Sequence, residues 1–432
     1  MEKLIARLGP YFSKSSLKPI GQVFGSQLIG KALGFSISIF LVRELSKEDY
    51  AIYTVLLTIQ GMLIPLSNSA IFIGFKKIGG EVWEDIVKMS RLVKTANLIS
   101  PYIIVLAFLL VGGYAFYILY LQEISVGRIS WFLLCLFLIV VPEVKTAFIR
   151  SALLLRKQIA IVQVSELVGH VIRCVGIISL LLFLKSSFII GAIFLITSLS
   201  AWISYIYVKK KGEITGISES VDVDKGYQKI LLKYIKINWH NSAFFAFKGQ
   251  ISIFLIGIFG TTSSLADIGA LSRFALVFTI ITALFGNIYS PAFGRCQNLR
   301  KLNKMYVVTM VSTVLLCFLV LLVVFLIPEP FLWILGENYE HLEHELFLIF
   351  LSGSVGLLLS INYAINLSKG WIKYTPMLEI PTDIAGIVLG VLLFDVTTLT
   401  GVLYLGILSA GINFLLHLFN SVAGLRAQPS TE

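Results

Sequence analysis

The sequence predicts an all-α polytopic membrane protein with twelve transmembrane helices in two six-helix bundles, which are related by a parallel pseudo-two-fold repeat. Three observations lead to this fold class: long apolar runs, a one-sided distribution of basic residues between them, and short matches between the two halves. The chain has 432 residues, of which 57% are hydrophobic and 14% charged, and its mean hydropathy is +0.89. Soluble domains carry about 25% charged residues, so this composition excludes an ordinary soluble protein.

Runs of apolar residues give the expected helices, because a helix needs about 20 such residues to cross a bilayer. Twelve runs lie at about 20–43, 50–75, 95–118, 129–149, 158–184, 187–207, 237–260, 264–292, 305–327, 344–367, 377–394 and 399–421. Residues 1–19 lack the apolar core of a cleavable signal peptide. Their mixture of apolar and basic side chains predicts a short amphipathic helix at the cytoplasmic surface.

Basic residues test this division independently, because cytoplasmic loops are enriched in lysine and arginine. If all twelve runs cross the membrane, most of the 35 basic residues fall on one side. The loops on that side contain Lys76, Lys77, Lys88, Arg91, Arg156, Lys157, Lys209, Lys210 and Lys211. The other side holds only Arg43, Lys47, Arg128 and Lys185. This alternation predicts that both termini are cytoplasmic.

An internal repeat follows from a polar connection at 208–228, which separates six helices from six. The pentapeptide Ile37-Ser-Ile-Phe-Leu41 returns as Ile251-Ser-Ile-Phe-Leu255, although chance matches between apolar segments are an alternative. Since six is even, both copies have the same orientation, as in transporters with a midplane site between parallel halves. The expected organisation is an amphipathic N-terminus (1–19), a six-helix bundle (20–207), a cytoplasmic linker (208–228), a second bundle (229–421) and a cytoplasmic tail (422–432).

Four cations in the apolar runs are candidate ligands for an anionic head group: Lys31, Lys248, Arg273 and Arg173. A basic residue at a helix centre costs about 2.5–3.5 kcal/mol on insertion scales, so it normally faces a wet cavity or a partner. Lys31 and Lys248 lie about eleven residues into their helices, which places both near the midplane. Pairing with carboxylates of other helices is the alternative role.

Intramembrane acids are fewer, and three groups are candidates for proton or ion coupling: Glu166, His170 and Asp383. Glu166, His170 and Arg173 share one helical face by their i, i+4, i+7 spacing. That spacing allows an ion pair between Glu166 and Arg173 with the histidine between them. A structural pair that stabilises the helix explains the same pattern.

Patterns that carry catalysis are absent from the sequence: it has no Walker-type glycine loop, no Gly-x-Ser-x-Gly elbow and no His-Glu-x-x-His motif. The four cysteines form no Cys-x-x-Cys pair, so neither a zinc site nor a disulfide framework is indicated. We therefore expect no enzyme activity, no metal and no cofactor. The net charge of +11 is attributed to cytoplasmic loops and not to nucleic-acid binding.

Three short motifs carry a resemblance to a known family. They are Phe40-Leu-Val-Arg-Glu-Leu-Ser-Lys-Glu-Asp-Tyr-Ala-Ile-Tyr53, Asp267-Ile-Gly-Ala-Leu-Ser-Arg273 and Leu332-Trp-Ile-Leu-Gly-Glu-Asn-Tyr339. These stretches resemble the polysaccharide repeat-unit flippases of the O-antigen translocase (Wzx) type, within the multidrug/oligosaccharidyl-lipid/polysaccharide exporter superfamily. Ala51 stands where the family usually has glycine.

The resemblance implies two six-helix bundles around a central cavity in the bacterial inner membrane. It also implies transport of an undecaprenyl-pyrophosphate-linked oligosaccharide for surface polysaccharide assembly, with a polysaccharide polymerase and a chain-length regulator as partners. A cationic midplane cavity suits a pyrophosphate. Moving negative charge outward also follows a negative-inside potential, which is worth about 2.3 kcal/mol per charge per 100 mV.

Other functions remain open at this point. An ion-coupled drug/cation antiporter of the same superfamily needs a carboxylate in the first or seventh helix, and neither helix contains one within its apolar run. A lipid II flippase is chemically closer, but such proteins usually have fourteen helices. A membrane glycosyltransferase or polymerase is disfavoured by the short external loops, and a non-transporting assembly factor is a further alternative.

Overall fold

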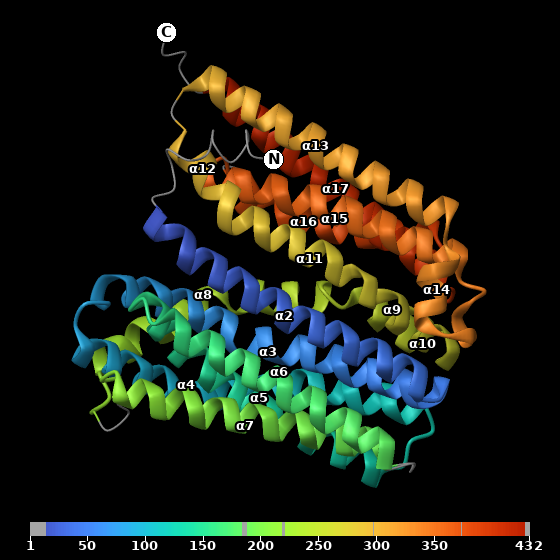
Figure 1. The fold of residues 1–432 in the computed structure, drawn as a ribbon, viewed down its shortest axis with the longest axis horizontal. Helices are drawn as coiled ribbons and strands as arrows, with labels where there is room; N and C mark the ends of the chain where they lie inside the picture. Colours follow the sequence, from blue (N-terminus) through green and yellow to red (C-terminus); the bar gives the residue numbers. More distant parts are fainter. Residues whose placement is uncertain (1–13, 184–187, 218–220, 297, 373, 428–432) are drawn as a thin grey trace. The chain divides into compact units, whose positions relative to one another are not determined.

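The computed structural model describes residues 14–183, 188–217, 221–296, 298–372 and 374–427, and these residues form helices joined by turns, with no β-strand among them. The expectation of an all-α membrane protein is confirmed. The expected amphipathic helix at 1–19 lies mostly outside the described residues. Figure 1 shows the arrangement of the helices within each part of the chain.

Every expected transmembrane run corresponds to a helix or to a group of consecutive helices. In the first half these are α2 (Lys14–Glu44), α3 (Lys47–Val82), α4 (Ile86–Leu121), α5 (Val126–Leu155), α6 (Ile159–Phe183) and α7 (Ile189–Ile214). In the second half they are α8 (Lys225–Lys248) with α9 (Ile251–Phe259), the segmented run 262–295, α13 (Leu299–Leu326), α15 (Glu343–Lys369), α16 (Thr375–Leu393) and α17 (Leu399–Ala427). Nine described helices are long and apolar enough to cross a membrane, or ten if α8 and α9 count as one span. Helices α2 and α16 form at the two remaining runs of the twelve expected from the sequence.

Two of the expected helices are interrupted, which the apolar runs did not reveal. The seventh breaks between α8 and α9 at Gly249 and Gln250. The eighth consists of α10 (Thr262–Leu271), η2 (Ser272–Phe274), α11 (Ala275–Leu284), the π-turn η3 (Phe285–Tyr289) and α12 (Ser290–Arg295). Irregular backbone at membrane depth is tolerated only inside protein or beside a water-filled cavity. The interruptions therefore mark places where function is expected.

The chain divides into two compact units. Unit 1 comprises residues 1–37 and 55–250, and unit 2 comprises residues 38–54 and 251–432. The turn between α2 and α3 thus belongs to the unit formed mainly by the second half. The domain boundaries expected from the sequence, at 207 and 229, stay a prediction.

Unit 1 is built around α5, which packs against α4, α6 and α7. Small residues on α6 allow a close approach of α7, because a Cβ atom at Gly169 would lie 2.8 Å from Ser204 Oγ and one at Gly176 would lie 2.7 Å from Ile196 Cγ2. Such small-residue contacts are the usual way in which membrane helices pack closely.

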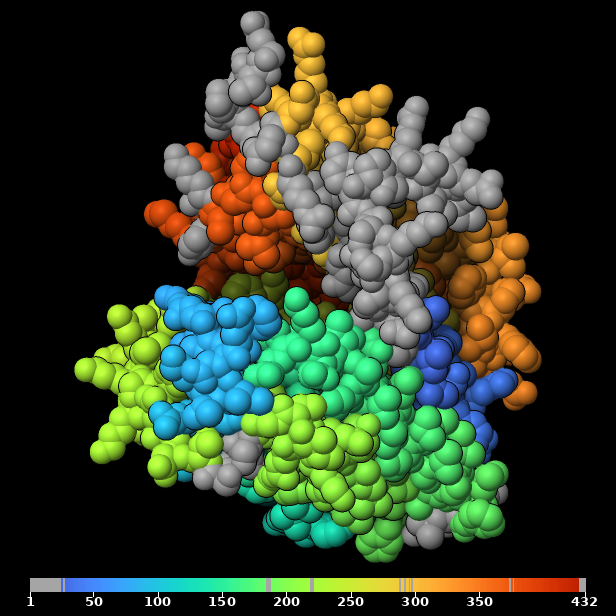
Figure 2. Space-filling view, turned by 60° about the vertical axis from the view of Figure 1, so that its left-hand side comes forward, coloured from blue at the N-terminus to red at the C-terminus, as the bar shows by residue number. Residues whose placement is uncertain are grey.

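Three connections of unit 1 meet at one end, as the alternation of charges predicted. Ser90 Oγ at the start of α4 donates to the carbonyl of Gly216 (3.3 Å), and the backbone N–H of Asp224 donates to Thr95 Oγ1 (3.2 Å). Lys157 after α5 lies 5.6 Å from the Trp83 ring after α3. Figure 2 shows this end, with the start of α4 in light blue, the α5–α6 connection in green and the connection before α8 in yellow-green. The basic residues of these connections therefore share one face of unit 1.

Unit 2 is built around α15, which packs against α17, α13, α11 and α12, while α16 packs against α17. Buried polar side chains join these helices: Ser421 Oγ lies 2.6 Å from the side-chain oxygens of both Asn362 and Asn366. Tyr306 OH of α13 donates to Asn362 (3.2 Å). The segment between α13 and α15 contains the short helix α14 (Glu329–Leu335) and the turn η4 (Glu337–Tyr339).

Asp85 caps the N-terminus of α4 and gives a measurable pH dependence. Its Oδ1 accepts hydrogen bonds from the backbone N–H groups of Lys88 (3.0 Å) and Val87 (3.1 Å). The hydrogen bond from the Lys88 backbone lowers the pKa of Asp85, and the Lys88 ammonium, 3.3 Å away, acts in the same direction. Because the folded pKa is depressed, the stabilisation is present above the ordinary value of 3.8 and is lost as pH falls through the folded pKa.

We expect Asp85→Ala to lower the melting temperature at pH 7, and this difference from the unsubstituted protein to shrink below about pH 4. Thermal unfolding in detergent, with the exposed Asp222→Ala as control, measures both effects; equal losses at pH 7 and at pH 3.5 would contradict the capping role.

Candidate functional site

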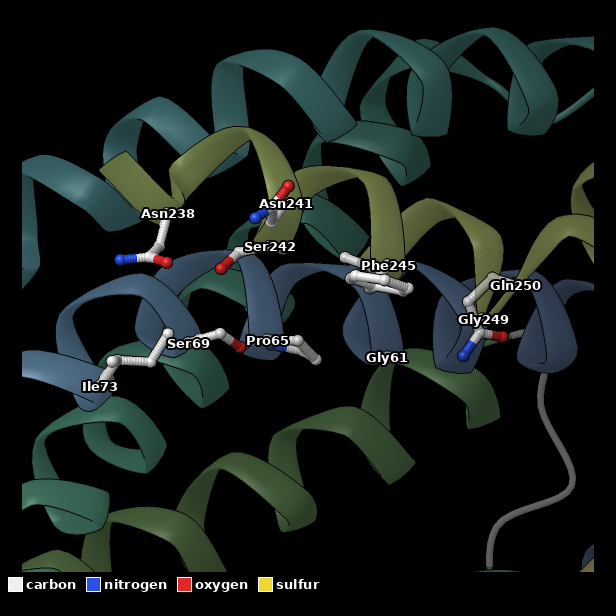
Figure 3. A pocket seen from close by; sticks show the side chains of 11 residues that line it. Gly61, Pro65, Ser69, Ile73, Asn238, Asn241, Ser242, Phe245, Gly249 and Gln250 are labelled. Carbon is white, nitrogen blue, oxygen red and sulfur yellow. The ribbon is translucent and has the colours of Figure 1, made fainter. Parts of the chain in front are cut away.

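A pocket of about 540 Å³ lies between α3 and α8 in unit 1. Helix α3 contributes one residue per turn to the lining. The other lining residues come from the second half of α8 and from the break that follows it. The lining residues are Gly61, Pro65, Ser69, Ile73, Asn238, Asn241, Ser242, Phe245, Ala246, Gly249 and Gln250. Figure 3 shows Ser242 and Phe245 on the side of α8 that faces α3, and Gln250 at the break after α8. No lining residue is charged.

Both hydrogen-bond donors and hydrogen-bond acceptors reach this pocket. Pro65 has no N–H, so the carbonyl of Gly61 lacks its usual partner one turn later in α3. Asn238 donates to the carbonyl of Tyr234 in its own helix (3.0 Å). The amides of Asn241 and Gln250 form no hydrogen bond with another described residue. The pocket therefore offers unused donors and acceptors.

The glycines of the pocket make room for this arrangement. A Cβ atom at Gly61 would lie 2.8 Å from the Gln250 Nε2 atom, so the Gln250 amide rests directly on the α3 backbone. Gly249 at the break of α8 is exposed. A side chain at Gly61 would displace Gln250 and narrow the pocket.

Lys248 is the last residue of α8 and directly precedes the pocket residue Gly249. Its Nζ lies 5.8 Å from the centre of the Phe245 ring. The sequence places Lys248 inside an unbroken helix, and this is wrong, because the helix ends there. A lysine at a helix C-terminus is stabilised by the negative end of the helix dipole.

Lys31 lies in the part of α2 that belongs to unit 1 and is half-buried. Its neighbour Gly30 packs on α6, where a Cβ atom would lie 2.9 Å from His170 Cδ2. The structure thus brings the α2 lysine region and the His170 face of α6 together. From the sequence, Lys31 was predicted to be among the ligands of an anionic head group, and His170 among the groups for proton or ion coupling.

Glu166 pairs with Arg150 of α5 at 3.9 Å. The sequence suggests Arg173 as its partner, but the structure selects an arginine from the neighbouring helix, which spacing along α6 does not reveal. Arg150 Nε also donates to Ser165 Oγ (3.1 Å). The Nε of Arg173 is buried and has no hydrogen-bond partner in the described part of the chain.

Arg273 belongs to unit 2 and lies in the turn η2 between α10 and α11. Its Nε donates to Tyr50 OH at 3.0 Å, and its Cζ lies 5.9 Å from the Tyr50 ring and 6.0 Å from the Tyr53 ring. Tyr50 is fully buried. These contacts with the start of α3 give Arg273 protein partners, and its anion-binding role stays a prediction.

The three sequence motifs meet around Arg273 in what we call the turn cluster: Arg43, Lys47, Tyr50, Asp267, Arg273, Trp333 and Tyr339. Lys47 forms an ion pair with Asp267 (3.4 Å) and lies 5.3 Å from the Tyr339 ring. Arg43 donates to the Trp333 carbonyl (3.3 Å) and lies 5.2 Å from its ring. The motifs therefore describe one packing arrangement in unit 2. In the sequence, this packing was indicated by the aromatic and charged residues of the three motifs.

Asp383 is fully buried in α16 and accepts a hydrogen bond from the Asn413 amide of α17. Thr382 Oγ1 donates to Asn413 Oδ1 (3.3 Å), so three polar side chains join α16 and α17. Among the predicted site residues, Lys31, Lys248, Arg173, Glu166 and His170 belong to unit 1, whereas Arg273 and Asp383 belong to unit 2. Within the described ranges, no three His, Cys, Asp or Glu side chains come close enough to hold a metal ion.

Solved structures of similar fold are membrane transporters. The chain superimposes on an inward-facing multidrug resistance MATE family transporter of the MOP superfamily with a TM-score of 0.64, at 13% identity over 93% of this chain and 96% of that one. An outward-facing structure of the same description gives 0.55 at 14% identity, covering 96% and 97%. A mutant of the Vibrio cholerae MATE transporter VcmN gives 0.61 at 14% identity, covering 96% and 98%. The chain has the MATE fold.

The match over nearly the whole length of both chains confirms the predicted fold class of an all-α membrane protein with two pseudo-repeat halves. No family model and no curated protein matches the sequence. The identities of 13–14% to the MATE structures establish the fold and leave the substrate to be argued from this chain's own residues.

Proposed function

We propose that this protein is an alternating-access transporter that flips an undecaprenyl-pyrophosphate-linked oligosaccharide repeat unit across the bacterial inner membrane. Its product would serve surface polysaccharide assembly, with a polysaccharide polymerase and a chain-length regulator acting next. The observation that carries the proposal is the α3–α8 pocket of unit 1, whose lining includes amides, hydroxyls and one aromatic ring, has no charged residue and ends beside Lys248.

Charge supports an anionic substrate. Residues 14–43 and 225–259, which cover α2, α8 and α9 up to the external turn, contain no aspartate or glutamate but include Lys31 and Lys248. A site for a cationic drug is expected to present a carboxylate, because complementary charge gives specificity. Cations and neutral amides instead suit a phosphate joined to sugars. The topology that fits this transport has both termini in the cytoplasm.

A drug/cation antiporter coupled to an ion is the second candidate. The multidrug resistance described for the structural neighbours favours it. Glu166 and Asp383, with His170, would then be the coupling groups, since they are carboxylates and a histidine within membrane helices. A membrane glycosyltransferase or polymerase is a weaker candidate, because no observation in the structure favours it.

The double substitution Lys31→Ala/Lys248→Ala tests the main proposal. We expect flipping of lipid-linked oligosaccharide in proteoliposomes to fall by about 100-fold or more, since each hydrogen bond to a charged group is worth about 1.5–3 kcal/mol. Lys210→Ala/Lys211→Ala removes the same charge from the exposed end of α7 and should leave the rate unchanged. Drug efflux is measured on the same preparations. Normal flipping by the first variant at normal protein level, or efflux of cationic drugs without lipid flipping, would refute the assignment.

A further inference from the structure

The unused hydrogen-bonding groups of the α3–α8 pocket point to a more specific role, which rests on the function proposed above. We propose that this pocket is a saccharide subsite, which binds the sugar next to the diphosphate of the lipid-linked unit, while Lys248 at the end of the pocket binds the phosphate. The sugar and the phosphate would then be recognised by different residues of one site.

The pocket has the capacity for such a ligand. Its volume of about 540 Å³ lies within the range of about 300–1,000 Å³ that is typical of small-molecule sites. Asn241 and Gln250 offer both donors and acceptors, and Ser69 and Ser242 add hydroxyls. A sugar hydroxyl is itself both donor and acceptor, so this mixed and uncharged set matches a saccharide better than it matches an ion.

The position of two side-chain amides in a membrane helix argues that they bind a ligand. Asn241 and Gln250 lie in the seventh membrane helix, and neither amide is paired with another described residue. Both residues are half-buried at the open pocket, and polar residues within membrane helices normally face a cavity or a pathway. Ordinary helix packing would have favoured apolar residues at these positions.

Phe245 supplies the apolar part of the proposed subsite. Its side chain is 38% exposed although it lies between α8 and α3 at the pocket. One face of a sugar ring carries mainly C–H groups, which can pack on an aromatic ring. Lys248 Nζ lies 5.8 Å from the centre of the same ring. A sugar on Phe245 would therefore place the adjoining phosphate close to the Lys248 ammonium.

The test separates sugar recognition from phosphate recognition. The full chain in lipid nanodiscs is titrated with undecaprenyl diphosphate, and with undecaprenyl diphosphate carrying N-acetylglucosamine, N-acetylgalactosamine, glucose or galactose. We expect at least one sugar-bearing lipid to bind about tenfold more tightly than the bare lipid, as two neutral hydrogen bonds would give. Asn241→Leu/Ser242→Ala should abolish this difference and leave binding of the bare lipid unchanged, whereas Lys248→Ala should weaken both lipids equally.

Controls keep a folding defect apart from a binding defect. Asn68→Leu alters an amide of α3 that does not line the pocket and should preserve the sugar preference. Gln250→Leu is a second pocket variant, and the melting temperature of each variant is measured. The inference is overturned if no sugar-bearing lipid binds more tightly than the bare lipid, or if both pocket variants retain the preference. Failure of the unsubstituted protein to bind any diphosphate lipid would instead refute the proposed function, and the subsite with it.

Discussion

The substitution Gly269→Val should prevent stable packing of α3 on α10 in unit 2. A Cβ atom at Gly269 would overlap the Thr54 hydroxyl and lie 2.8 Å from its Cγ2 and 2.9 Å from its Cβ. Thr54 is buried and cannot swing into solvent. Overpacking of this kind costs about 1–3 kcal/mol and occasionally more, and valine adds two methyl groups beyond the Cβ. We expect a sharp loss of folded protein on size-exclusion chromatography and a melting temperature lowered by several degrees.

A compensating pair isolates the cause of this effect. Gly269→Ala combined with Thr54→Gly moves the missing side chain to the opposite helix, so it should recover part of the stability that Gly269→Ala loses alone. Gly411→Val is the control, because a Cβ atom in that part of α17 meets nothing within 4 Å. Equal destabilisation by Gly411→Val and Gly269→Val would show that helix propensity, and not the α3–α10 contact, explains the result.

Removal of the Tyr50 hydroxyl should destabilise unit 2 through Arg273. In Tyr50→Phe the Arg273 Nε loses its 3.0 Å acceptor while the ring that covers it remains. Arg273 is half-buried, and leaving such a donor without its acceptor costs about 1–3 kcal/mol. We expect a loss of stability of this size in thermal or denaturant unfolding. Flipping should fall only in proportion to the loss of folded protein.

Arg273→Lys distinguishes packing from substrate binding at the same position. Lysine keeps the charge but lacks the planar guanidinium that reaches Tyr50 and Tyr53 together. If Arg273 acts by holding the start of α3, this variant should resemble Tyr50→Phe in stability. A variant that is as stable as the unsubstituted protein but has lost flipping would instead assign Arg273 to the substrate, as the sequence first suggested.

The positions of the membrane helices could be predicted because the bilayer imposes a simple rule. Every backbone polar group must be paired inside a membrane segment, so a long apolar run has to become a helix. This is why the runs near 95–118 and 344–367 correspond directly to α4 and α15. The run at 377–394 also forms a helix, although Glu379, Pro381 and Asp383 weaken its signal, since Asp383 accepts a hydrogen bond from Asn413 and is covered by protein.

Helix interruptions could not be predicted from the same rule. Pro65 lies inside the continuous helix α3, whereas the break between α8 and α9 occurs at Gly249 and Gln250 without a proline. Neighbouring helices decide which freed backbone groups can be satisfied. Gln250 rests on the α3 backbone at Gly61. This contact cannot be predicted from residues 248–251 alone.

The sequence by itself determined the fold class, the presence of cations within the apolar runs and the lack of acidic residues in the apolar parts of α2, α8 and α9, because composition and spacing decide these properties. Tertiary structure alone decided the partners of those charges. It paired Glu166 with Arg150, placed Lys248 at a helix end beside an amide-lined pocket, and joined Lys47 to Asp267. The physical reason is that a hydrogen bond or ion pair depends on distances of a few ångströms between helices, and residues 47 and 267 become neighbours only when those helices pack.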